Sequence, residues 1–223
     1  MSEERALSYI NRATHIITLV FGIMIAISGM HHGIFELLQG NKETPGLIIQ
    51  AISPEFQRWQ NGEEAFTLIP NFLITGICSI TIGIAIILWS IKGLQTKYGR
   101  SIFLLLFIIL TLCGGGIGYT IFFLSAWAYG TRMNKPLKRW RKVLKGKLIG
   151  SIAKAWIPLL VITSLFYIIA LEISVFGIPG INDNNTILQV CWSFLFASFL
   201  ILHITYISGF AHDISILKKI NLQ

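Results

Sequence analysis

The residues best suited to chemistry lie at the end of the first apolar segment. His32, Glu36 and Gln39 share one helical face, and His31 lies about 100° further round the helix. A carboxylate beside a histidine can orient the ring, and such a pair could ligate a metal, relay a proton or bind a polar solute. Because ionisable groups are costly in a membrane, these residues are candidates for a functional site. The alternative is an interfacial cap, in which the same side chains meet water and headgroups.

Further polar residues precede or begin the second apolar segment. Glu63, Glu64 and Asn71 are expected at the same end of the bundle as the histidines, and could complete their cluster. Asn61 and Glu64 have the spacing of a helix capping pair, which predicts that the second helix begins near Gly62. Helix capping therefore stays open as an alternative role for each glutamate.

Motifs of known cofactor and catalytic sites are missing from the sequence, and no cofactor is predicted. There is no HExxH helix, no P-loop and no GxSxG elbow. His31, His32 and Glu36 are candidate ligands of a divalent metal, but they supply only part of a ligand set. A haem is disfavoured because these histidines could pair across helices only with His203.

The elements that must position these residues are five long apolar stretches. Each reaches the roughly 20 residues that a helix needs to cross a bilayer. Backbone polar groups in lipid must be satisfied within the segment, so each stretch is predicted to be helical. The predicted fold class is all-α, a polytopic transmembrane helical bundle in a single domain, residues 1–223. The stretches are Ile16–Leu38, Phe66–Ile91, Ser101–Tyr129, Ala155–Ile178 and Ile187–Phe210.

The composition agrees with this assignment. Of the 223 residues 54% are hydrophobic and 13% charged, whereas a soluble domain carries about 25% charged residues. The mean hydropathy is +0.69. These values exclude a soluble globular domain and a disordered chain.

The third stretch admits two arrangements. As one tilted helix, it gives five spans with the N-terminus outside, which places 13 of the 18 basic residues in the cytoplasm. As a re-entrant hairpin turning near Gly114–Gly118, it leaves four spans and places 16 there. We favour five spans, because glycines are common where membrane helices pack closely. Glu172 would lie at the same end as the histidines only in the re-entrant arrangement.

Residues 130–154 carry nine of the 18 basic residues, and the part from Pro136 to Lys154 predicts a basic interfacial helix. Anionic headgroups attract such a helix, so we expect this segment and the C-terminus on the cytoplasmic side of a cell membrane. Nucleic acid is not expected as a partner, because the run directly precedes a span. The apolar residues at helical spacing are Leu137, Trp140, Leu144 and Leu148. The predicted lipid-surface residues are Lys138, Arg139, Trp140, Arg141, Lys142, Lys145 and Lys147.

Several strings resemble those of a group of small prokaryotic membrane proteins of unknown function. The resemblance implies a prokaryotic multi-spanning protein, and it supplies no activity and no catalytic residues. The strings are His31-His32-Gly33-x-x-Glu36, Gln39-Gly40-Asn41, Thr67–Gly76, Thr131–Leu137 and Gly209–Asp213.

Three classes of function remain. The first is a multi-pass membrane protein without catalytic activity, with an accessory, sensory or structural role. The second is transport of a small solute, an ion or a proton through the His/Glu cluster. The third is a metal-assisted membrane enzyme.

Overall fold

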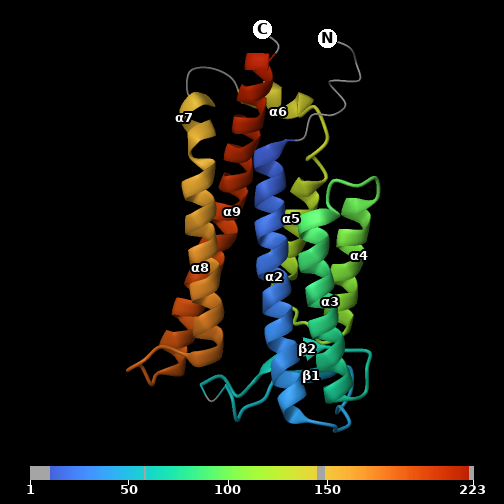
Figure 1. The fold of residues 1–223 in the computed structure, drawn as a ribbon. Coiled ribbons are helices and arrows are strands. Elements are labelled where there is room, and N and C mark those ends of the chain that lie inside the picture. Colours follow the sequence, from blue (N-terminus) through green and yellow to red (C-terminus); the bar gives the residue numbers. More distant parts are fainter. Residues whose placement is uncertain (1–10, 58, 145–148, 221–223) are drawn as a thin grey trace.

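The computed structural model describes residues 11–57, 59–144 and 149–220, which form a bundle of helices with a small sheet at one end (Figure 1). Four helices, α2, α3, α8 and α9, are long and apolar enough to cross a membrane, in agreement with the predicted membrane bundle. The helices are α2 (Arg12–Gln39), α3 (Phe72–Lys92), α4 (Gly99–Leu112), α5 (Thr120–Gly130), α6 (Lys138–Val143), α7 (Ile149–Lys154), α8 (Trp156–Phe176) and α9 (Asn184–Ile220).

Two antiparallel strands, β1 (Ile48–Ile52) and β2 (Glu63–Phe66), correct the all-α expectation. Asn61 and Gly62 have φ values of 59° and 101°, so the chain is left-handed just before β2. A helix start does not accommodate this conformation. The expected helix near Gly62 is therefore wrong, and Glu64 is an exposed strand residue rather than a capping partner.

The helix that follows the sheet begins at Phe72. Its N-cap is Asn71, whose side-chain oxygen accepts a hydrogen bond from the Ile74 N–H at 3.1 Å. The helix packs closely along α2, because Gly33 and Gly76 face each other. A Cβ on Gly76 would lie 2.5 Å from the carbonyl oxygen of Gly33. Small residues at such a contact let two membrane helices approach.

The stretch expected as a third crossing forms two short helices, α4 and α5, that run in opposite directions. Both of its ends lie near the start of α2. Gln95, just before α4, contacts His15 at 3.2 Å, and the indole N–H of Trp127 donates to the carbonyl of Arg100 across the two helices. The middle of the stretch lies against the last turns of α2, where Gly114 meets Glu36. The favoured fifth crossing is not confirmed, and the geometry corresponds to the re-entrant alternative.

The glycines cause the reversal between α4 and α5. Gly114 and Gly116 have φ values of 92° and 89°, which glycine adopts readily and other residues rarely do. A continuous helix contains no such residues. In this sequence the glycines therefore break the helix rather than merely allow two helices to pack.

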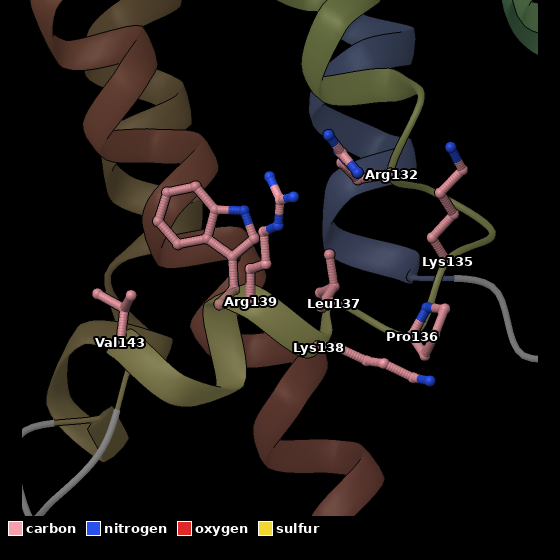
Figure 2. A pocket seen from close by; sticks show the side chains of 8 residues that line it. Arg132, Lys135, Pro136, Leu137, Lys138, Arg139 and Val143 are labelled. Carbon is pink, nitrogen blue, oxygen red and sulfur yellow. The ribbon is translucent and has the colours of Figure 1, made fainter.

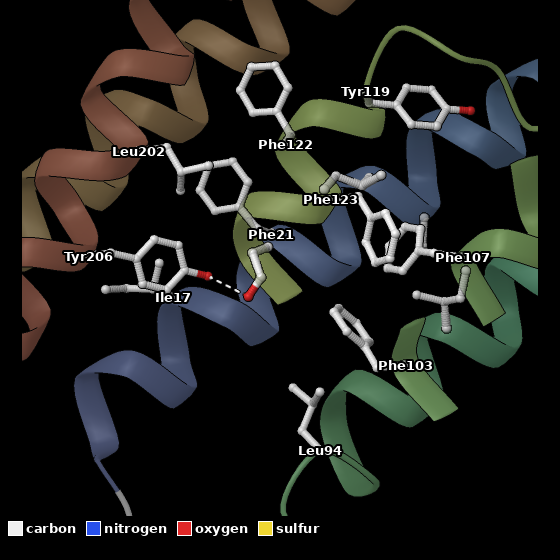
Figure 3. Packing of buried hydrophobic residues seen from close by; sticks show 14 of the residues in the cluster. Ile17, Phe21, Leu94, Phe103, Phe107, Tyr119, Phe122, Phe123, Leu202 and Tyr206 are labelled. Atoms are coloured by element: carbon white, nitrogen blue, oxygen red, sulfur yellow. Dashed lines mark hydrogen bonds between the residues drawn. The ribbon is translucent and has the colours of Figure 1, made fainter. Parts of the chain in front are cut away.

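An apolar layer fills the middle of the bundle (Figure 3). Phe21 of α2 and Phe122 of α5 lie parallel, with ring centroids 6.5 Å apart. Tyr167 and Phe199 pack edge-on against Phe122 at 5.1 and 5.5 Å. On α2 this layer separates polar residues near the two ends of the helix.

The basic segment does not form the single helix that the spacing predicts. The structure has α6 and α7 in its place, and Lys145, Lys147 and Leu148 lie outside the described residues. Leu137 and Leu144 are buried within the protein, in a cluster with Phe210 of α9. The reason for the break is local, since Leu144, after α6, leaves the helical conformation with a ψ of 85°.

Candidate functional site

A buried polar cluster lies at the end of the bundle that carries the sheet. We call it the His–Glu cluster: His32 and Glu36 from α2, Glu63 from β2 and Tyr119 from the start of α5. Glu36 is 0% exposed, His32 2% and Tyr119 8%. The Nε2 atom of His32 lies 3.6 Å from Oε1 of Glu63, and the ring of Tyr119 stands edge-on to the imidazole at 5.9 Å. Three elements distant in sequence therefore contribute to one site.

The glycine turn between α4 and α5 covers this cluster. A Cβ on Gly114 would lie 2.3 Å from Oε1 of Glu36. On Gly116 it would lie 2.6 Å from the Tyr119 hydroxyl and 2.9 Å from Nε2 of His32. The backbone thus approaches the polar groups more closely than any residue with a side chain allows.

The turn is also bonded to the strand that carries Glu63. The Gly114 N–H donates to the carbonyl of Phe66 at 2.9 Å, and the Leu68 N–H donates to the carbonyl of Leu112 at 2.9 Å. The turn therefore extends the ladder of the sheet beyond the end of β2.

Several buried polar atoms of the site have no partner among the residues that the structure describes. They include both carboxylate oxygens of Glu36, Nδ1 of His32 and the Tyr119 hydroxyl. Most buried polar groups in proteins are hydrogen-bonded, and an unpaired carboxylate is the costliest exception. The arrangement favours a species that brings positive charge or hydrogen-bond donors toward Glu36.

Glu63 lies outside the membrane-spanning helices, in a mixed environment. Burial alone would raise the pKa of its carboxyl group, but the His32 imidazole and the Gln57 amide beside it hold the pKa below its ordinary value. The Gln57 amide also donates to the carbonyl of Ser174 at the end of α8. Glu63 is therefore ionised near neutral pH, in a strand that lies against the end of the bundle.

A cavity of about 70 Å³ adjoins the cluster. Glu63 and Tyr119 line it together with Tyr167 of α8 and Cys191 of α9. The Tyr167 hydroxyl is paired with the hydroxyl of Ser28 at 2.9 Å. Pockets for drug-sized ligands measure about 300–1,000 Å³, so this cavity suits a species with only a few non-hydrogen atoms.

Of the predicted site residues, the structure brings His32, Glu36 and Glu63 together. His31 is half-buried, and its ring packs against Phe35 at 6.3 Å. Within the described ranges, no group of three or more His, Cys, Asp or Glu side chains is placed to hold a metal ion. The divalent-metal hypothesis for His31, His32 and Glu36 stays a prediction.

The other predicted site residues lie apart from this group. The Gln39 amide donates to the carbonyls of Gln50 and Ala51 at 2.8 and 2.9 Å, so it attaches β1 to the end of α2. Besides capping α3, Asn71 donates to Asn41 Oδ1 at 2.8 Å. The side chains of Glu64 and Glu172 are exposed. None of the four is in the His–Glu cluster.

Sequence reasoning missed Tyr119, Tyr167 and Gln57. A signal for Tyr119 exists, because it directly follows the glycine-rich stretch whose turn covers the cluster. No local pattern marks the other two, since their role depends on which helix ends meet.

Comparison of the chain with protein-family profiles, with curated proteins and with solved structures finds no match.

Proposed function

We propose that this membrane protein binds a small ammonium-type cation at the His–Glu cluster, in a sensory or accessory role without catalysis. The observation that carries the proposal is Glu63, a carboxylate ionised near neutral pH that lines the cavity beside the cluster. Glu36 adds a second buried carboxyl group, whose oxygens have no donor among the described residues, and His32 is the one basic side chain in the cluster. A cation supplies the positive charge that this arrangement favours.

The chemistry of the cavity selects the class of cation. The carboxyl group of Glu63 and the rings of Tyr119 and Tyr167 line one small space. Aromatic faces attract ammonium groups, and the attraction grows when water is excluded. The methyl groups of an alkylammonium ion would meet the apolar lining, which includes Ala170 and Leu195.

The apolar layer in the middle of the bundle supports binding of the cation rather than its transport through the bundle. Towards the basic end the Thr18 hydroxyl is paired with that of Tyr206 at 3.1 Å, and towards the other end Ser28 is paired with Tyr167. Between these pairs lie Phe21 and its aromatic neighbours. We therefore propose a site entered from one side.

That side is proposed to be the outer one. With both ends of the α4–α5 stretch near the start of α2, 13 of the 14 basic residues that the structure describes belong to the end of the bundle opposite the sheet. Basic residues are enriched on the cytoplasmic side of membrane proteins. The distribution of basic residues therefore supports a location of the sheet and the His–Glu cluster on the side of the membrane opposite the cytoplasm.

The test is the unfolding midpoint of the purified chain in detergent, measured while methylammonium chloride replaces sodium chloride at constant ionic strength. We expect a saturable rise, equivalent to about 2.7 kcal/mol at 100 times the Kd. Glu63→Gln should abolish the rise. The matched control is Glu64→Gln, which alters the exposed neighbour on the same strand and should leave the rise unchanged.

Two results would refute the proposal. One is the absence of a rise with methylammonium in the unmodified chain. The other is an equal rise in Glu63→Gln and Glu64→Gln, which would mean that the rise comes from the overall surface charge and not from Glu63.

A further inference from the structure

A second site lies at the basic end of the bundle, far from the His–Glu cluster. The segment between α5 and the end of α6 surrounds a cavity of about 630 Å³. Four cations line it, namely Arg132, Lys135, Lys138 and Arg139, together with Trp140 and Val143. Figure 2 shows the side chains of Arg132, Lys135 and Arg139 extending to the same side of the segment. The cavity is therefore a concentrated positive site.

None of these four cations forms an ion pair with a carboxylate in the part of the chain that the structure describes. The single ion pair there is between His32 and Glu63, at the other end of the bundle. The sequence has no acidic residue between Glu64 and Glu172, and 12 of the 18 basic residues fall in that interval. The charge of the pocket is available to an external anion.

The backbone of the pocket is fixed in place by α2. The buried Asn11 side chain donates to the carbonyls of Arg132 and Lys135 at 2.8 and 2.9 Å, and the Asn11 N–H donates to the carbonyl of Met133 at 2.8 Å. Met133 is itself fully buried. The cations thus project from an ordered turn, which reduces the entropy lost when a ligand binds.

We propose that this pocket binds the phosphodiester headgroup of an anionic phospholipid. Arginine and lysine bind phosphate oxygens through charge-assisted hydrogen bonds. The pocket also has features that a free phosphate would not use. Trp140 is half-buried against Phe210, as expected for an indole at headgroup depth, and Val143 is 72% exposed beside it. A lipid can place its phosphate among the cations and its chain against this apolar edge.

The test is native mass spectrometry of the full chain released from detergent that contains phosphatidylglycerol or phosphatidylcholine. We expect selective retention of phosphatidylglycerol. The double variant Arg132→Gln/Arg139→Gln should weaken that binding by about 30-fold, the factor expected when two basic headgroup contacts are lost. The matched control is Lys92→Gln/Lys97→Gln, which removes two exposed cations at the same end of the bundle but outside the pocket. This control should bind like the unmodified chain.

Three outcomes would overturn the proposal. Equal weakening in the two double variants would mean that the total charge of the surface binds lipid. Equal retention of the two lipids would show that the cations do not select the headgroup. Binding of inorganic phosphate alone, with the same dependence on Arg132 and Arg139 and with displacement of the lipid, would identify a free-anion site. Because the altered arginines are exposed, an unchanged unfolding midpoint will show that the variants are folded.

Discussion

Two carboxylates, Asp213 and Glu36, lie against opposite ends of α2, and both are 0% exposed. Asp213 accepts hydrogen bonds from the N–H groups of Ala13 and Thr14 at 2.9 and 3.1 Å, and from the Thr14 hydroxyl at 2.7 Å. Glu36 has no donor among the described residues. Burial alone therefore does not distinguish a structural carboxylate from a candidate site.

The direction of the helix explains the difference. The first turn of a helix presents unpaired N–H groups and a partial positive charge, and the last turn presents carbonyls and a partial negative charge. Asp213 of α9 meets the first turn and caps it, since the side chain of Asn11 does not. Glu36 lies in the last turn, where the backbone offers no donors. Asp213 follows the fifth predicted stretch, yet its side chain is buried for this reason.

The largest effect is expected from Asp213→Ala. It leaves two buried N–H groups at the start of α2 unsatisfied, so the free energy of unfolding should fall by about 3 kcal/mol. Asp213→Asn, which keeps an acceptor oxygen, should lose about half as much. Urea or thermal unfolding in detergent measures both. An unchanged midpoint for the alanine variant would contradict the capping role.

Gly114→Ala should have the next largest effect. The new Cβ would collide with the Glu36 carboxylate at a φ of 92°, and the cost should be about 2 kcal/mol. The control is Gly118→Ala, where a Cβ meets nothing within 4 Å. Combining Gly114→Ala with Glu36→Ala should recover part of the loss, as a double-mutant cycle would show. Strict additivity would mean that the turn does not cover Glu36.

Glu36→Gln tests the comparison directly. It removes the cost of burying an unpartnered carboxyl group and breaks no hydrogen bond among the described residues, so stability should change by less than about 1 kcal/mol, toward higher values. This is opposite in sign to Asp213→Asn. A clear loss of stability in Glu36→Gln would show that Glu36 is a structural residue like Asp213.

The smallest effect concerns pH and Glu63. Because its pKa is lower in the folded chain than the ordinary 4.5, the ionised carboxylate contributes stability above about pH 4.5, and this contribution is lost as the pH falls through the lowered pKa. His32→Asn should reduce this acid-side dependence while the chain remains folded at neutral pH. Stability profiles from pH 3 to 7 for the two proteins provide the measurement. Coincident profiles would argue against an interaction between His32 and Glu63.

The long helices could be predicted from sequence because hydropathy alone defines them. The predicted stretch Ala155–Ile178 corresponds to α8, Trp156–Phe176. The reversal at Gly114–Gly118 could not be decided in the same way. Glycines favour both close helix contacts and turns, and only the positive φ values distinguish the two.

Residue types that fit two local structures also limited the prediction of the sheet and of the His–Glu cluster. Asparagine is common both at helix N-caps and in left-handed turns. In the structure, Asn61 lies in a left-handed turn. The pairing of His32 with Glu36 follows from helical spacing. Glu63 is expected at this end of the bundle from its place in the sequence. Its contact with His32 and the approach of Tyr119 depend on the strand and the turn, which local patterns did not predict.

The hydrogen bonds between β2 and the glycine turn couple two parts of the protein mechanically. Glu63 begins the strand, and at its other end the Phe66 carbonyl accepts a hydrogen bond from the N–H of Gly114, which lies against Glu36. A displacement of Glu63 along the strand axis is therefore transmitted to the turn through the backbone. Binding in the cavity that Glu63 lines is therefore expected to shift the glycine turn against α2 and α3.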